Sequence, residues 1–284
     1  MNQAPSFEPL ACHNLNVMKR AYITLLTTDD YLHGLLVLIF SLREVKSKYE
    51  CSVLITPNIS LRTKSILAAH AIAYIEISDI PNPTDVHPSH RWNRTYSKLH
   101  VFGLNQYEKV VFLDADMIIL ENIDVLFECE HLSAASSGSM LPACSDWTHM
   151  NSGLFVAVPD ASLFSDMISC VGRVEALNGG GTTNTPRSGS DQEFINAHYR
   201  DWKRCFKLHL DHRYNMLHYH LDGYNSLFGY TLTAGPKRVA VIHYASYLKP
   251  WSLPSETIRT LMSGVQLTLE NQALRIWLET NSRI

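Results

Sequence analysis

Strand-like runs alternate with helix-like segments through the first third of the chain. The strand-like runs are RAYITLLTT, CSVLITP and IAYIEI, and helix-like segments lie at residues 31–45 and 61–71. Strand–helix alternation of this kind is typical of a parallel sheet with helices on both faces. The pattern therefore predicts an α/β fold with a Rossmann-like, mostly parallel central sheet.

Length and charge limit the classes of protein that this chain can belong to. The 284 residues are 46% apolar and 18% charged, with a formal net charge of −3. A chain of this length can bury a large core, and its near-neutral charge gives no sign of nucleic-acid binding. We expect a polar, flexible leader over residues 1–19, one domain over residues 20–284 and no nucleic-acid partner.

The cysteines and the apolar segments indicate the compartment. The six cysteines are spread along the chain without a Cys-x-x-Cys pair, which is typical of reduced thiols in an intracellular protein. The leader lacks the basic and apolar regions of a signal peptide. The longest apolar stretch, YLHGLLVLIFSL, is too short to span a membrane. We therefore expect a cytoplasmic protein without a membrane span.

The stretch YEKVVFLDADMIIL places two carboxylates at the end of an apolar strand. Asp114 follows four apolar residues, and Asp116 comes after one further residue. In an open α/β sheet, ligands bind at the carboxyl ends of the strands. Two like charges this close are costly unless a cation neutralises them, and oxygen ligands suit Mg²⁺ or Mn²⁺. These residues alone leave two interpretations open, a metal site for a phosphate-bearing substrate or a solvated turn.

A phosphohydrolase offers a second chemistry for the same motif. Haloacid-dehalogenase-type phosphatases also place D-x-D after an apolar strand, and the first aspartate, Asp114 here, is the nucleophile. Their motif is DxDxT and lies near the N-terminus. In this chain three strand-like runs precede Asp114, and residues 117–120 are apolar. Because this chain departs from that motif in both respects, the phosphohydrolase is the weaker alternative.

Eight short motifs follow one another between residues 24 and 251. They are TLLTTDDYLHG, YSKLHVF, YEKVVFLDAD, NIDVLF, NSGLFV, SGSDQEFIN, YN at Tyr214 and Asn215, and IHYASYLKPW. In this order they resemble glycosyltransferase family 8, the retaining sugar transferases that include glycogenin and galactinol synthase. The resemblance implies a GT-A fold and metal-dependent transfer of a hexose from a UDP-sugar, with Mn²⁺ or else Mg²⁺ as the metal. It leaves the acceptor open and allows a homodimer.

The resemblance also implies a metal site and a counter-charge for the leaving group. The matching metal ligands are Asp114, Asp116 and His243. Imidazole is an acceptable ligand for Mn²⁺. Lys249 would face the diphosphate and offset the negative charge that develops on the departing UDP.

Asp191 and Gln192 match the family residues beneath the anomeric carbon of the sugar. Asp191 would act either as a nucleophile or as a ligand of sugar hydroxyls. Tyr31 would stack on the uracil. The full set of expected donor contacts is Leu25, Thr27, Thr28, Tyr31, Lys98, Asp114, Ala115, Asp116, Asn151, Ser152, Asp191, Gln192, His243, Ser246 and Lys249.

Donor sugar and acceptor stay open at this stage. The segment SGSDQ has Ser188 where the glycogenin-like DGGDQ has its first acid. We expect loops over residues 79–91, 137–148 and 178–189 to select the acceptor, the last also being a candidate lid. The histidines of HLDHRYNMLHYH match no standard zinc spacing and are candidates to line the acceptor cleft. A non-catalytic UDP-sugar-binding or glycan-binding protein of the same fold is the main alternative.

Overall fold

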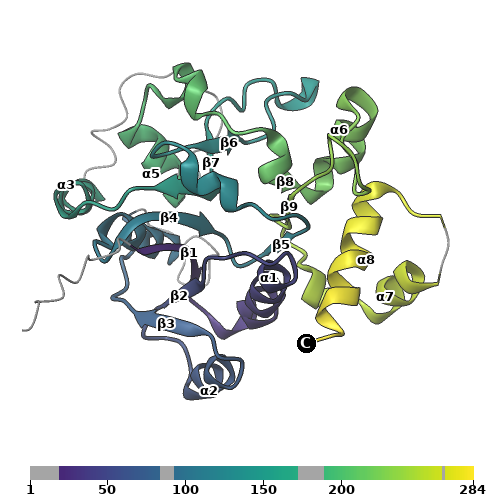
Figure 1. The fold of residues 1–284 in the computed structure, drawn as a ribbon, viewed down its shortest axis with the longest axis horizontal. Helices are drawn as coiled ribbons and strands as arrows, with labels where there is room; N and C mark the ends of the chain where they lie inside the picture. The colour runs from purple at the N-terminus through teal and green to yellow at the C-terminus, as the bar shows by residue number, and fades with distance from the viewer. Residues whose placement is uncertain (1–18, 84–92, 172–188, 264–265) are drawn as a thin grey trace, which may run out of the picture.

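A six-stranded sheet forms the centre of the computed structural model, which describes residues 19–83, 93–171, 189–263 and 266–284 (Figure 1). The strand order is β3–β2–β1–β4–β7–β6, and β7 alone runs in the direction opposite to the other five strands. The strands are β1 (Lys19–Leu26), β2 (Cys51–Ile55), β3 (Ala73–Glu76), β4 (Tyr107–Leu113), β6 (Ala134–Ser136) and β7 (Met150–Ala157). The predicted α/β fold with a mostly parallel sheet is confirmed.

Helices cover both faces of this sheet because successive side chains of each strand point to opposite sides. On one face Ile23 of β1 packs in a cluster with the 3₁₀-helix Thr95–Gly103 and with α3 (Ala161–Val171). On the other face Tyr22 packs with Leu38 of α1 (Leu32–Glu44). The remaining helices near the sheet are α2 (Leu61–Ala69) and α5 (Asp191–His198).

A second sheet, which the sequence did not predict, contains three short strands. Its order is β5–β9–β8, with β5 (Met117–Ile119), β9 (Val241–His243) and β8 (Met216–Leu217). The apolar strand predicted before Asp114 is β4, which ends at Leu113, and the chain then enters the small sheet at Met117. The two aspartates therefore lie on the link between the sheets.

The C-terminal part of the chain packs against the small sheet. Its helices are α6 (Leu221–Phe228), α7 (Ser255–Met262) and α8 (Leu269–Asn281). Figure 1 shows α8, in yellow, beside β5 and β9, and its buried Trp277 shares a core cluster with Ile118 and Ile242. Within the described ranges, no helix has the length and apolar character that a membrane span requires.

Candidate active site

Hydrogen bonds and one close packing contact fix the link Asp114–Ala115–Asp116. The Asp114 N–H donates to the Gly153 carbonyl of β7 at 2.8 Å, and the Tyr244 N–H donates to the Asp116 carbonyl at 2.9 Å. Helix α1 packs closely against the link at Gly34. A Cβ on Gly34 would lie 2.6 Å from the Ala115 carbonyl oxygen and 2.6 Å from the Trp251 ring. Only glycine fits there, and sequence reasoning gave it no such role.

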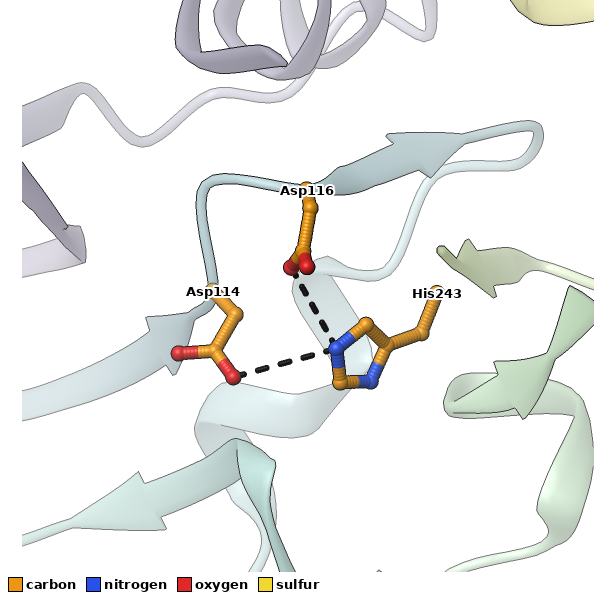
Figure 2. Close-up of side chains that lie close together, drawn as sticks. All are labelled: Asp114, Asp116 and His243. Atoms are coloured by element: carbon orange, nitrogen blue, oxygen red, sulfur yellow. Dashed lines mark ion pairs between the residues drawn. The ribbon is translucent and has the colours of Figure 1, made fainter. Parts of the chain in front are cut away.

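Asp114, Asp116 and His243 form a cluster that could hold a metal ion. One ligand atom from each lies within 4.8 Å of the others. His243 Nε2 is 3.3 Å from Asp116 Oδ1 and 3.8 Å from Asp114 Oδ2 (Figure 2). The antiparallel pairing of β5 with β9 sets Met117 opposite His243 and so brings the histidine to the aspartates. The structure thus assembles the three ligands that the family resemblance implied.

A chain of hydrogen bonds sets which nitrogen of His243 carries the proton. The Gly153 N–H, which can only donate, lies 2.8 Å from Asn151 Oδ1. That oxygen also accepts from Asn215 Nδ2 at 3.0 Å, so the Asn215 amide turns its oxygen toward His243 Nδ1, 3.0 Å away. Nδ1 must therefore be the donor, which makes Nε2 the ring nitrogen that faces the aspartates and could ligate a metal.

Replacing Asn215 by alanine should weaken metal binding, because His243 would lose the partner that fixes its tautomer. Loss of such an orienting partner typically costs about 10- to 100-fold in metal affinity. Titration calorimetry with Mn²⁺ would measure the change. Asn225→Ala is the control, since the Asn225 amide also donates one hydrogen bond, but to the Tyr230 carbonyl at 2.8 Å and not to a residue of the site. Unchanged affinity in folded Asn215→Ala would contradict the proposed hydrogen-bond chain.

A buried lysine lies beside each aspartate. Lys98 Nζ is 3.0 Å from Asp114 Oδ1 and 2.8 Å from Asp191 Oδ2. Burial by itself lowers the pKa of Lys98, but the two carboxylates outweigh it and hold the pKa above the usual range. Lys249 Nζ is 2.6 Å from Asp116 Oδ2 and also donates to the Tyr244 carbonyl at 2.7 Å. The site therefore holds fixed positive charge on both sides of the carboxylate pair.

The pKa values of the two aspartates are shifted in opposite directions. Burial acts to raise the pKa of Asp116, but Lys249 and His243 overcome this and hold the pKa well below its usual range. Burial, reinforced by the negative charge of Asp116, raises the pKa of Asp114 despite the opposing effect of Lys98. Asp114 is also the more accessible, with 29% of its side chain exposed against 8% for Asp116. A divalent cation would remove the repulsion that keeps the two pKa values apart.

Asp191 and Gln192 open helix α5 next to this cluster. Ser190 caps the helix by accepting from the Glu193 N–H at 3.3 Å, as serine commonly does at this position. Ser152 of β7 holds both residues, since its hydroxyl donates to Asp191 Oδ2 at 2.9 Å and its N–H donates to Gln192 Oε1 at 3.1 Å. The NSG and DQ motifs are thus one hydrogen-bonded unit.

The other predicted donor contacts lie around the same edge of the sheet. Leu25 is near the carboxyl end of β1, and Thr27 and Thr28 follow that strand. The Tyr31 ring lies 5.3 Å from the Trp251 ring and 5.5 Å from Lys249 Nζ. The remaining residue, Ser246, donates to the Leu248 carbonyl at 2.7 Å. Residues 178–188 of the candidate lid and residues 84–91 of the 79–91 loop lie outside the described residues.

Gly153 is a second glycine whose role only the structure shows. A Cβ at this position would lie 2.5 Å from His243 Cε1 and 2.8 Å from its Nδ1. Gly153→Ala should therefore displace the imidazole and lower both Mn²⁺ affinity and any UDP release at least about tenfold, the lower bound for losing an orienting contact. Gly103→Ala is the control, because its Cβ would meet the Phe164 ring at 2.8 Å, away from the aspartates. It should reduce stability and spare Mn²⁺ affinity; equal affinity losses in both variants would contradict the prediction.

Solved structures of similar architecture identify the fold class. The galactosyltransferase LgtC, solved in complex with donor and acceptor sugar analogues, matches with a TM-score of 0.60 at 16% identity over 94% of this chain and 96% of LgtC. The apo-form glycosyltransferase GlyE of Streptococcus pneumoniae TIGR4 matches with a TM-score of 0.58 at 17% identity, over 93% of this chain and 60% of GlyE. The fold is that of the GT-A glycosyltransferases.

Sequence comparison gives the family. The sequence model of glycosyl transferase family 8 matches residues 22–161, and Glycogenin-1 of Oryctolagus cuniculus is 30% identical over 84% of this chain and 67% of its own length. The chain belongs to glycosyltransferase family 8. Inositol phosphorylceramide glucuronosyltransferase 1 of Arabidopsis thaliana is 35% identical over 65% of this chain, which spans only 31% of that relative.

Proposed function

We propose that the protein is a retaining glycosyltransferase that moves a hexose from a UDP-sugar to an acceptor hydroxyl and depends on Mn²⁺ or Mg²⁺. The observation that carries this proposal is the cluster of two carboxylates and one imidazole at the carboxyl end of β4. Two oxygen donors and one nitrogen donor suit these cations. The Nδ1 proton of His243 is held by Asn215, so Nε2 is the ring nitrogen available to ligate a metal.

The bound cation would neutralise the diphosphate of the donor. The residues of the chain supply the rest. Lys249, next to Asp116, is placed to stabilise charge on the departing UDP. In the transfer, the bond between the anomeric carbon and the diphosphate oxygen breaks and its electron pair leaves on UDP. The acceptor oxygen forms the new bond on the same face, and its proton passes to the departing diphosphate oxygen.

Asp191 is better suited to hold the sugar than to attack it. Its Oδ2 already accepts from Lys98 and from the Ser152 hydroxyl. Both donors withdraw charge from this oxygen, which reduces its nucleophilicity, while the carboxylate can still stabilise positive charge that develops at the anomeric carbon. This arrangement supports same-face departure and attack more than a covalent glycosyl-enzyme.

A donor screen tests the proposal. UDP-glucose, UDP-galactose, UDP-N-acetylglucosamine and UDP-glucuronate would each be incubated with Mn²⁺ and with EDTA, and UDP release measured. Release that requires the metal supports the transferase. Tight UDP binding without turnover favours the non-catalytic alternative. Phosphate release from sugar phosphates that Asp114→Asn abolishes would establish the phosphohydrolase and overturn the proposal.

We further propose that residues 20–284 form one catalytic domain that works in the cytoplasm. The described cysteines are all free thiols, which suits a reducing compartment. They are Cys51, Cys129, Cys144, Cys170 and Cys205. Of the predicted leader, only Lys19 falls in the described part of the chain, and β1 begins there.

A further inference from the structure

Two aromatic side chains are exposed beside the candidate active site. Trp147 is 42% exposed in the segment between β6 and β7, and Tyr219 is 37% exposed in the 3₁₀-helix His218–His220. His220 lies between them, with its ring centroid 6.3 Å from that of Trp147 and 4.5 Å from that of Tyr219. We call these three side chains the aromatic platform.

Both segments that carry the platform start from residues of the site. The Trp147 segment begins at Ser137, whose hydroxyl oxygen accepts from Gln192 Nε2 at 3.4 Å. The 3₁₀-helix follows β8, where Leu217 pairs with the metal-ligand candidate His243. A contact of 3.8 Å between Cys144 Sγ and His220 Nε2 joins the two segments. The platform therefore bridges the Gln192 side and the His243 side of the site.

The chemistry around the two exposed rings suits a sugar. Exposed aromatic side chains cost solvation free energy, and where they gather beside a site they usually mark a binding surface. The residues on either side of Trp147 are polar and exposed: Ser145, Asp146, Thr148 and His149. A sugar ring offers one C–H face to an aromatic ring and a rim of hydroxyls to polar neighbours. An acyl chain would leave those polar groups without partners.

We propose that Trp147 and Tyr219 bind a sugar ring of the acceptor, so that the acceptor is an oligosaccharide. The inference rests on the proposed transferase function and narrows its acceptor class. His220 holds the two rings in place and offers a polar edge to the hydroxyls. A tyrosine hydroxyl of a protein and the headgroup of a lipid are the alternative acceptors, and each is an outcome of the test below.

Binding can be measured without turnover. The indole N–H resonance of Trp147, assigned by its loss in Trp147→Phe, would be followed by NMR in the UDP- and Mn²⁺-bound protein. The probes are maltotetraose, cellotetraose and xylotetraose, with a tyrosine-containing peptide and a short-chain ceramide for the alternatives. We expect at least one oligosaccharide to shift the resonance. No shift with any oligosaccharide, or a shift with only the peptide or ceramide, would overturn the proposal.

Kinetics give the second measurement. With the oligosaccharide that binds, Trp147→Ala and Tyr219→Ala should each raise the acceptor KM at least tenfold and lower the ratio of sugar transfer to donor hydrolysis. Phe206→Ala is the matched control, because Phe206 is 78% exposed and packs near His209 instead of the platform. An acceptor KM within twofold of wild type in both platform variants would overturn the proposal. If no donor releases UDP, the transferase proposal fails, and the NMR titration still decides whether the platform binds sugar.

Discussion

Asp116→Asn should abolish sugar transfer and weaken Mn²⁺ binding while the protein stays folded. The substitution removes one of the two anionic ligand candidates, yet the amide oxygen can still accept from Lys249, whose ammonium lies 2.6 Å from Asp116 Oδ2. A weaker hydrogen bond to this charged group should cost about 1–3 kcal/mol in the free energy of unfolding. Activity should fall at least about 100-fold, since even loss of a group that orients a ligand costs about 10- to 100-fold.

UDP release and Mn²⁺ titration measure this effect, and circular dichroism establishes the fold. Asp166→Asn is the control, because Asp166 is an exposed carboxylate on α3. It should leave turnover and Mn²⁺ affinity within twofold of wild type. Near-normal turnover of Asp116→Asn with added Mn²⁺ would show that the metal assignment is wrong.

Lys98→Met should lower both stability and activity, because Lys98 is the buried cation between Asp114 and Asp191. Methionine fills similar space but leaves two carboxylates without their counter-charge. Breaking a buried ion pair by removing one partner typically costs about 3–5 kcal/mol. Urea unfolding in EDTA measures this cost without help from a bound metal. An unfolding free energy within 1 kcal/mol of wild type would refute the prediction.

Two further variants separate this effect from simple loss of a lysine. Lys64→Met removes a lysine whose Nζ lies 2.7 Å from Glu76 Oε1, and the Glu76 side chain is mostly exposed. Its loss should therefore cost no more than about 1 kcal/mol in the free energy of unfolding. Combining Lys98→Met with Asp191→Asn should cost less than the sum of the two single changes, because the double variant removes both charges of one pair. Additive costs would mean that Lys98 and Asp191 do not interact in the folded protein.

The sequence predicted the large sheet well because local patterns encode it. Runs such as CSVLITP carry the β-branched residues and the terminal proline that mark a strand. The small sheet was missed because its strands have only two or three residues. Strands this short leave no periodicity to read.

By itself, the sequence determined which groups the protein has for its chemistry: the aspartates after an apolar run, a distant histidine and lysine, and the ordered motifs of the family. Tertiary structure alone decided how they act together. Pairing of β5 with β9 brings His243 to Asp116, and the amides of Asn151 and Asn215 set the His243 tautomer. Such contacts join residues far apart in the chain, and their geometry depends on backbone direction and side-chain packing, which local sequence patterns do not carry.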